Sequence, residues 1–230
     1  MEDDEGIRAA RLLAAQESAE ALFRAIEAEG ILRPGVWDSA ASEAVYELAG
    51  ERFGVEQHWH KRIVRSGPNT LQPYVADPPD RQMVEGDIVF ADFGPVFVGW
   101  EADFGRTWVL GDDPVKLRLR DDLAPVFAAG QAFYRTHPEI TAADMYAEMI
   151  RLAGDRGWEF GNMHCGHLVG EHPHEEMAGG RLDSLICASN PRPLRGPDPS
   201  GRVGHWILEV HLVDRDLQIG GFLEQLLTLP

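Results

Sequence analysis

Apolar residues recur at helical spacing in four stretches of the chain, at 6–29, 38–54, 114–136 and 142–156. The first pattern ends at Gly30. Asp38 or Ser39 is expected to be the N-cap residue of the second helix, and Thr141 that of the fourth, because short polar side chains can accept a hydrogen bond from a free N–H of the first turn. These helices are amphipathic, so we expect them to cover one face of a sheet.

Strand patterns lie between and after the helices, and they are rich in β-branched and aromatic residues. The expected extended segments are 58–66, 87–93, 96–100, 106–110, 167–174, 205–212 and 221–228. Gly94-Pro95 marks a turn between two of them. Two helices followed by strands occur twice along the chain, which predicts a pseudo-duplicated α+β fold.

Residues 176–203 show neither pattern and are rich in Pro, Gly and Arg. We expect an irregular surface loop or lid there. The remaining segments can share one core, so residues 1–230 are predicted to form a single domain.

Composition limits the possible partners. The 38 acidic and 21 basic residues give a net charge of −17, which disfavours nucleic acid. No apolar stretch is long enough to span a membrane, and the amino terminus lacks a secretory signal, so a cytoplasmic location is expected. Cys165 and Cys187 are too few for a disulfide framework and are expected to be reduced thiols.

Four carboxylates interrupt segments that are otherwise strand-like and apolar: Asp92, Asp103, Glu209 and Glu224. Each could lie on the solvated face of a strand, but four such positions are hard to explain independently, since a buried carboxylate needs a partner. With His167 they form an oxygen-rich ligand set. Such a set suits a pair of divalent cations such as Mn²⁺, Co²⁺ or Fe²⁺ better than a structural zinc.

The order and spacing of these residues resemble the pita-bread metallopeptidases, a family that includes methionine aminopeptidase, Xaa-Pro aminopeptidase, prolidase and the non-peptidase creatinase. Asp103 follows Asp92 by eleven positions, and His174 follows His167 by seven. The resemblance extends to Ser66-Gly-Pro-Asn, Glu85-Gly-Asp-Ile-Val-Phe-Ala-Asp-Phe-Gly, Arg106-Thr107, Gly166-His-Leu-Val-Gly-Glu-His-Pro-His-Glu and Gly220-Gly. It covers nearly the whole chain and corresponds to the catalytic domain alone.

The resemblance implies a curved antiparallel sheet covered by helices, with two divalent ions, most simply Mn²⁺ and otherwise Co²⁺, Fe²⁺ or Zn²⁺. By the same resemblance, Asp92 would chelate one ion, His167 and Glu209 the other, and Asp103 and Glu224 would bridge them. Glu209 would also exchange a proton with the attacking water, and His174 would contact the substrate carbonyl. The implied reaction is hydrolysis of a peptide-like amide bond, with Xaa-Pro peptides as the nearest substrates.

Three departures leave the substrate open. Where many relatives have Pro-His, this chain has Pro73-Tyr74, so Tyr74 replaces a substrate-binding imidazole unless His58 or His60 supplies it. Phe222 stands where prolidase-like enzymes have an Arg, and the segment between His167 and Glu209 is long. A creatinase-like hydrolase of another amide or amidine, and a binding protein without catalysis, are the alternatives. The partner is expected to be a small peptide or amino-acid derivative, and a homodimer is the default assembly.

Overall fold

The computed structural model describes residues 2–173, 182–198 and 200–229. Its four α-helices are α1 (Glu2–Ala28), α2 (Asp38–Phe53), α3 (Pro114–Thr136) and α4 (Ala142–Asp155). Thr141 caps α4 as predicted, in a reciprocal capping box with Asp144. The predicted cap of α2 is wrong: Trp37 is the N-cap and makes no side-chain bond there. Asp38 is instead buried, where it accepts hydrogen bonds from the backbone and hydroxyl of Ser66.

A largely antiparallel sheet forms the centre of the molecule, in the order β1-β2-β5-β10-β9-β7-β8, with β6 paired to β9. Its strands are β1 (Ile63–Ser66), β2 (Ile88–Phe93), β5 (Phe104–Val109), β6 (Glu159–Phe160), β7 (His164–Val169), β8 (Leu185–Cys187), β9 (His205–Asp214) and β10 (Ile219–Leu226). The short pair β3 (Val96–Phe97) and β4 (Trp100–Glu101) lies outside it. Two 3₁₀ turns, η1 (Gly67–Leu71) and η2 (Leu182–Ser184), complete the described elements.

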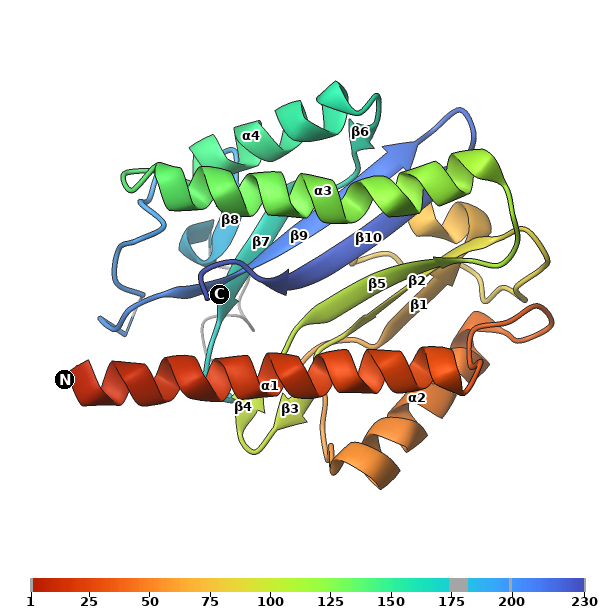
Figure 1. The fold of residues 1–230 in the computed structure, drawn as a ribbon, viewed down its shortest axis with the longest axis horizontal. Helices are drawn as coiled ribbons and strands as arrows, with labels where there is room; N and C mark the ends of the chain where they lie inside the picture. The colour runs from red at the N-terminus through yellow and green to blue at the C-terminus, as the bar shows by residue number, and fades with distance from the viewer. Residues whose placement is uncertain (1, 174–181, 199, 230) are drawn as a thin grey trace.

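The pseudo-duplicated α+β arrangement is confirmed. In Figure 1, α1 and α2 lie beside the β1-β2-β5 half of the sheet, and α3 and α4 lie beside the half formed by β7 to β10. Each half has its own apolar core: Phe23 and Phe93 belong to the first, Met149 and Leu208 to the second. The β5–β10 pair joins the halves at the middle of the sheet.

Four predicted segments differ from the structure. Residues 96–100 are divided between the paired strands β3 and β4, and the strand expected from His167 onwards is β7, which begins at His164 and ends at Val169. Only residues 63–66 of the expected extended segment 58–66 form a strand, although His58 makes an isolated bridge with Pro95. Residues 182–203 are not wholly irregular, because Leu185–Cys187 forms β8 and pairs with β7. This apolar run packs Ile186 into the second core, where its burial outweighs the loop-like composition around it.

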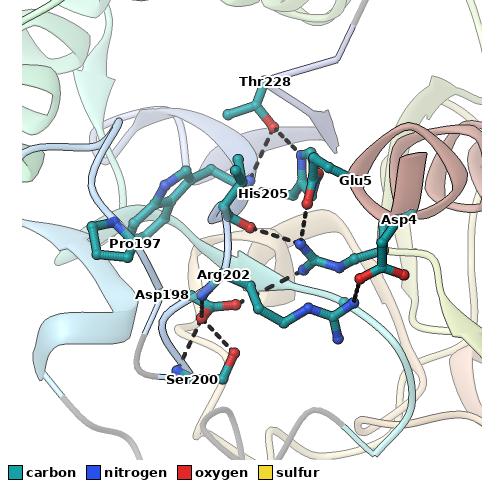
Figure 2. Close-up of polar contacts among 12 residues, drawn as sticks. Asp4, Glu5, Pro197, Asp198, Ser200, Arg202, His205 and Thr228 are labelled. Carbon is teal, nitrogen blue, oxygen red and sulfur yellow. Dashed lines mark hydrogen bonds and ion pairs between the residues drawn. The ribbon is translucent and has the colours of Figure 1, made fainter. Parts of the chain in front are cut away.

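A polar cluster ties the start of α1 to the end of the sheet (Figure 2). His205 Nε2 lies 2.7 Å from Glu5 Oε1, and its Nδ1 lies 3.3 Å from the hydroxyl of Thr228. The buried guanidinium of Arg8 pairs with Glu5 and donates to the carbonyl of Val203. Residues near both ends of the chain therefore hold each other in place.

Among the described residues, no helix combines the length and the apolar character needed to cross a membrane.

Candidate metal centre

Strand register brings three of the four predicted carboxylates into one row across the sheet. Asp92 of β2 is opposite Gly105 of β5, Gly105 is opposite Glu224 of β10, and Glu224 is opposite Glu209 of β9. Asp103 immediately precedes β5. Gly105 has no side chain at the middle of the row. A Cβ there would clash, since it would lie 2.6 Å from the Phe222 ring and 3.2 Å from Cβ of Glu224.

Side-chain alternation places this row on the face away from the helices. In β9, Leu208 and Val210 belong to the second apolar core, so Glu209 between them points to the opposite face. In β2, Ala91 and Phe93 likewise pack in the first core on either side of Asp92. All four carboxylates are nevertheless buried, so the alternative that they lie on a solvated strand face is wrong.

His167 of β7 points into the middle of this group. Its Nε2 lies 3.0 Å from Asp103 Oδ2, 3.5 Å from Glu224 Oε1 and 3.8 Å from Glu209 Oε1. Its other nitrogen, Nδ1, lies 2.9 Å from the carbonyl of Leu168. A carbonyl only accepts, so Nδ1 carries a proton, and Nε2, which faces the carboxylates, is the atom that would bind a cation in place of its own proton.

His60, which the sequence assigned to the substrate, lies on the other side of Asp103. Its Nε2 is 3.0 Å from Asp103 Oδ1 and 3.6 Å from Asp92 Oδ1. Asp103 therefore lies between two imidazoles, one at each carboxylate oxygen.

Glu209 has a separate set of partners that the sequence did not identify as a unit. Asn162 donates from Nδ2 to Oε2 at 3.2 Å, and His164 Nδ1 lies 3.3 Å from Oε1. An irregularity in the β7–β8 register falls between His164 and His167. Residues three apart on a regular strand would face opposite sides, so this irregularity lets both imidazoles approach Glu209.

Crowding changes the pKa values of the carboxylates in opposite directions. Burial raises the pKa of Asp92 to about 7, and burial together with the charges of Asp103 and Asp92 raises that of Glu224 well above its usual value. For Asp103 burial acts the same way, but His60 and His167 outweigh it and lower the pKa. His164 and His167 similarly overcome burial at Glu209 and lower its pKa.

The imidazoles respond to the same charges. Burial opposes protonation of His60, but Asp103 and Asp92 outweigh it and raise the pKa of His60 to about 9. The pKa of His167 is also raised, because hydrogen bonding and charge from Asp103 outweigh burial. Glu209 raises the pKa of His164. The site thus holds an excess of negative charge that attracts cations.

The donor set fits divalent cations. Within the described part of the chain, two groups place one ligand atom per residue within 4.8 Å of one another: His60, Asp92 and Asp103, and Asp103, His167 and Glu224. Asp92 Oδ1 is buried and has no hydrogen-bond partner among the described residues. Such an atom is costly unless something positive meets it, which a cation between these oxygens would do.

The carboxylates line a cavity of about 460 Å³ that also contains Tyr74 and Phe222. The Tyr74 hydroxyl accepts a hydrogen bond from the backbone N–H of Lys61, which places it beside His60. Arg65 also lines the cavity, but its guanidinium donates to carbonyls of residues 72–76 and so holds the Tyr74 loop. A charged side chain directly after Ile63 and Val64 was the sequence signal for Arg65, of the same kind that identified Asp92.

His174 lies outside the described residues, so its expected contact with the substrate stays a prediction. His172, two positions earlier, lines the cavity with its Nδ1 3.3 Å from the buried Glu101.

Comparison with known proteins finds similarity to metal-dependent peptidases. Residues 10–197 match the model of metallopeptidase family M24, a segment that contains Asp92, Asp103 and His167 and ends before Glu209. The chain is 23% identical over 192 residues to the Xaa-Pro dipeptidase of Pyrococcus horikoshii, which covers 80% of this chain and 54% of that protein.

Solved structures share the fold. The prolidase from Thermococcus sibiricus superposes with a TM-score of 0.71 at 20% identity, covering 96% of this chain and 56% of that one. The X-Pro aminopeptidase from Thermotoga maritima gives 0.69 at 18% identity, covering 96% and 61%. The chain spans little more than half the length of these relatives. With a family match over most of its length and the same fold around its carboxylates, the chain belongs to metallopeptidase family M24 and has the pita-bread fold.

Proposed function

We propose that this protein hydrolyses a peptide-like amide bond with two divalent metal ions, and that its substrates are small Xaa-Pro peptides. The observation that carries the proposal is the pair of ligand groups that share Asp103. Two groups with one common carboxylate are the arrangement that a bridged pair of ions requires.

In this proposal Asp92 would hold one ion, His167 and Glu209 would hold the other, and Asp103 and Glu224 would contribute to both sites. Mn²⁺ is the ion that we expect first, with Co²⁺, Fe²⁺ or Zn²⁺ as substitutes. The ions would supply Lewis acidity, which lowers the pKa of water and polarises an amide carbonyl.

The protein itself supplies the proton acceptor. The lowered pKa keeps Glu209 ionised, and Asn162 fixes the orientation of its carboxylate. Glu209 can therefore take a proton from the attacking water and pass it to the leaving amine. His174 remains our candidate for the contact to the substrate carbonyl.

The cavity supports a small substrate with an apolar part. Ile63, Phe90 and Phe222 form an apolar cluster on its wall, which suits a proline ring. The similarity to an Xaa-Pro dipeptidase points the same way. Arg65 is committed to backbone carbonyls, and Phe222 adds no charge, so substrate carboxylate recognition would differ from that of prolidase-like enzymes. Creatine-like amidines are the second candidate substrates, because the Tyr74 and Phe222 departures leave the substrate class open.

The test is hydrolysis of an Xaa-Pro dipeptide panel and of creatine by protein loaded with Mn²⁺, with the bound metal measured in parallel. We expect about two ions per chain and turnover of at least one Xaa-Pro peptide. Asp103→Asn should lose metal and reduce turnover by at least about 1,000-fold, since it removes the bridging charge. Asp121→Asn, at an exposed position outside the cavity, is the matched control and should retain both.

Metal binding without turnover of any substrate would favour the non-catalytic alternative. A chain that takes up no divalent metal would refute the proposal outright.

A further inference from the structure

We propose that His60 is itself a metal ligand, completing the site formed by Asp92 and Asp103, so that each of the two ions binds one imidazole. The inference rests on the proposed dinuclear centre and changes the role of His60 from substrate contact to ligand. It also changes which ions the centre should prefer.

Distances between donor atoms support this role. Donors about 2.1 Å from one ion lie about 3.0 Å apart at right angles and about 3.4 Å apart at tetrahedral angles. His60 Nε2 lies 3.0 Å from Asp103 Oδ1 and 3.6 Å from Asp92 Oδ1. The corresponding distance from His167 Nε2 to Asp103 Oδ2 is also 3.0 Å, so the two imidazoles stand in the same relation to the shared carboxylate.

The hydrogen bond at the far side of the ring fixes the tautomer that a ligand needs. His60 Nδ1 lies 2.7 Å from the carbonyl of Lys61, and His167 Nδ1 lies 2.9 Å from that of Leu168. Each histidine therefore donates from Nδ1 to the carbonyl of its own following residue, so Nε2 is the nitrogen that faces the carboxylates and that a cation would bind in place of its proton.

The surroundings of His60 hold its ring in this position. Trp59 packs edge-on against the rings of both His60 and His167, with its indole N–H donating to the carbonyl of Ala102. A Cβ on Gly94 would lie 2.1 Å from the His60 ring, so the absence of a side chain there makes room for it. The His60 side chain is only 7% exposed.

A second nitrogen donor should shift the metal preference. Without His60, the Asp92 site has oxygen donors alone, which suit Mn²⁺ and Mg²⁺. With one imidazole at each ion, Co²⁺, Fe²⁺ and Zn²⁺ gain more than Mn²⁺ does. Removal of His60 should therefore weaken Co²⁺ binding more than Mn²⁺ binding.

The test is proton NMR of the Co²⁺-loaded full chain with ¹⁵N-labelled histidine. The ring N–H proton of an imidazole bound to paramagnetic Co²⁺ is shifted far outside the normal range, and both proposed ligands carry such a proton at Nδ1. We expect two shifted resonances in the unsubstituted protein. His60→Gln should remove one of them, and His167→Gln the other.

His58→Gln is the matched control, because His58 lies on the same segment but packs against Tyr46 and Phe93 outside the cavity. It should retain both resonances, and so should His164→Gln, which removes the imidazole beside Glu209. If His60→Gln does not fold, loss of one resonance in His164→Gln would assign the second imidazole to His164 and overturn the inference. Affinity for one Co²⁺ should fall at least about tenfold in His60→Gln, since loss of a group that merely orients a ligand already costs about 10–100-fold.

Two resonances in a folded His60→Gln protein, or a single one in the unsubstituted protein, would overturn the inference. Either result leaves the proposed function standing if two Co²⁺ ions bind. Failure of the unsubstituted chain to bind Co²⁺ or Mn²⁺ would instead remove the dinuclear centre itself.

Discussion

Asp92 and Asp103 are the same residue type in one cavity, yet the structure moves their pKa values apart. Asp103 lies between two imidazoles that stabilise its charge, whereas Asp92 Oδ1 has no hydrogen-bond partner among the described residues. The contrast is created by contacts within about 4 Å. It gives the metal-free protein a characteristic dependence on pH.

We predict that the metal-free protein loses stability as the pH rises from about 6.5 to about 9, above the range in which His58 and His211, whose pKa values burial lowers to about 4, add stability. The raised pKa of Asp92, about 7, means that the folded state holds its proton more tightly than the unfolded chain, so the contribution of Asp92 falls between pH 4 and 7. The stability from His60, with a pKa of about 9, is complete below pH 6.5 and is lost as the pH rises through 9. Thermal unfolding with a chelator present measures this.

Metal should reverse the trend over the same range, because these ligands must lose their protons to bind a cation. With saturating Mn²⁺ or Co²⁺, we expect the melting temperature to rise with pH between 6 and 8. His60→Gln should flatten the metal-free curve above pH 6.5. Parallel curves with and without metal would contradict the prediction.

At the scale of elements, the break in the β7–β8 register between His164 and His167 shapes the site. Gly166 lies between His164 and His167 with a φ of 149°, and a Cβ there would come within 2.1 Å of the carbonyl oxygen of Ile207 in β9. The neighbouring atom is backbone, so it cannot move aside cheaply. Glycine at this position allows β7 to approach β9 and to direct both histidines towards Glu209.

We therefore predict that Gly166→Ala destabilises the protein by about 3 kcal/mol or more, through a steric clash and an unfavourable φ. Gly154→Ala is the matched control. Gly154 lies in α4, and a Cβ added there would meet open space. The substitution should stabilise the protein by up to about 1 kcal/mol. Chemical denaturation of both variants measures the difference. Equal changes in the two would show that β7 tolerates a Cβ.

The elements also differ in how far the sequence predicted them. The helices and long strands follow from periodicity, and Thr141 and Asp144 form the cap that their spacing predicts. Asp38 did not follow the same rule, because Ser66, 28 positions away, competes for its carboxylate. The register irregularity of β7 had no signal in the pattern beyond Gly166 itself.

Across the whole molecule, the site depends on both halves of the duplicated fold. Asp92 and Asp103 come from the first half, and His167, Glu209 and Glu224 from the second. Polar contacts centred on His205 join the start of α1 to the last residues of the chain (Figure 2). Arg8 is buried in these contacts, whereas Arg202 pairs with Asp4 at the surface.

We predict that Arg8→Met lowers the free energy of unfolding by about 2–3 kcal/mol, because it takes the cation away from Glu5 and Asp198 and leaves the carbonyl of Val203 without its side-chain donor. Arg202→Met should cost less than about 0.5 kcal/mol, since its ion pair is exposed and screened. The two substitutions remove the same charge from one cluster. Equal losses in urea unfolding would contradict the role given to burial.

The sequence alone determined the helices, most of the strands, the duplicated α+β plan and the identity of the five expected ligands. Periodicity is a local property, and a carboxylate inside an apolar strand is conspicuous wherever the strand lies. These features therefore needed no knowledge of the tertiary structure.

Only the tertiary structure decided how those residues meet. The row from Asp92 to Glu209 depends on strand register, and the position of His60 beside Asp103 depends on a contact across 43 positions of chain. Burial of all four carboxylates, and the opposite pKa shifts within the group, also arise from packing between distant segments. Such quantities are set by distances in space, and a linear pattern of residues does not contain them.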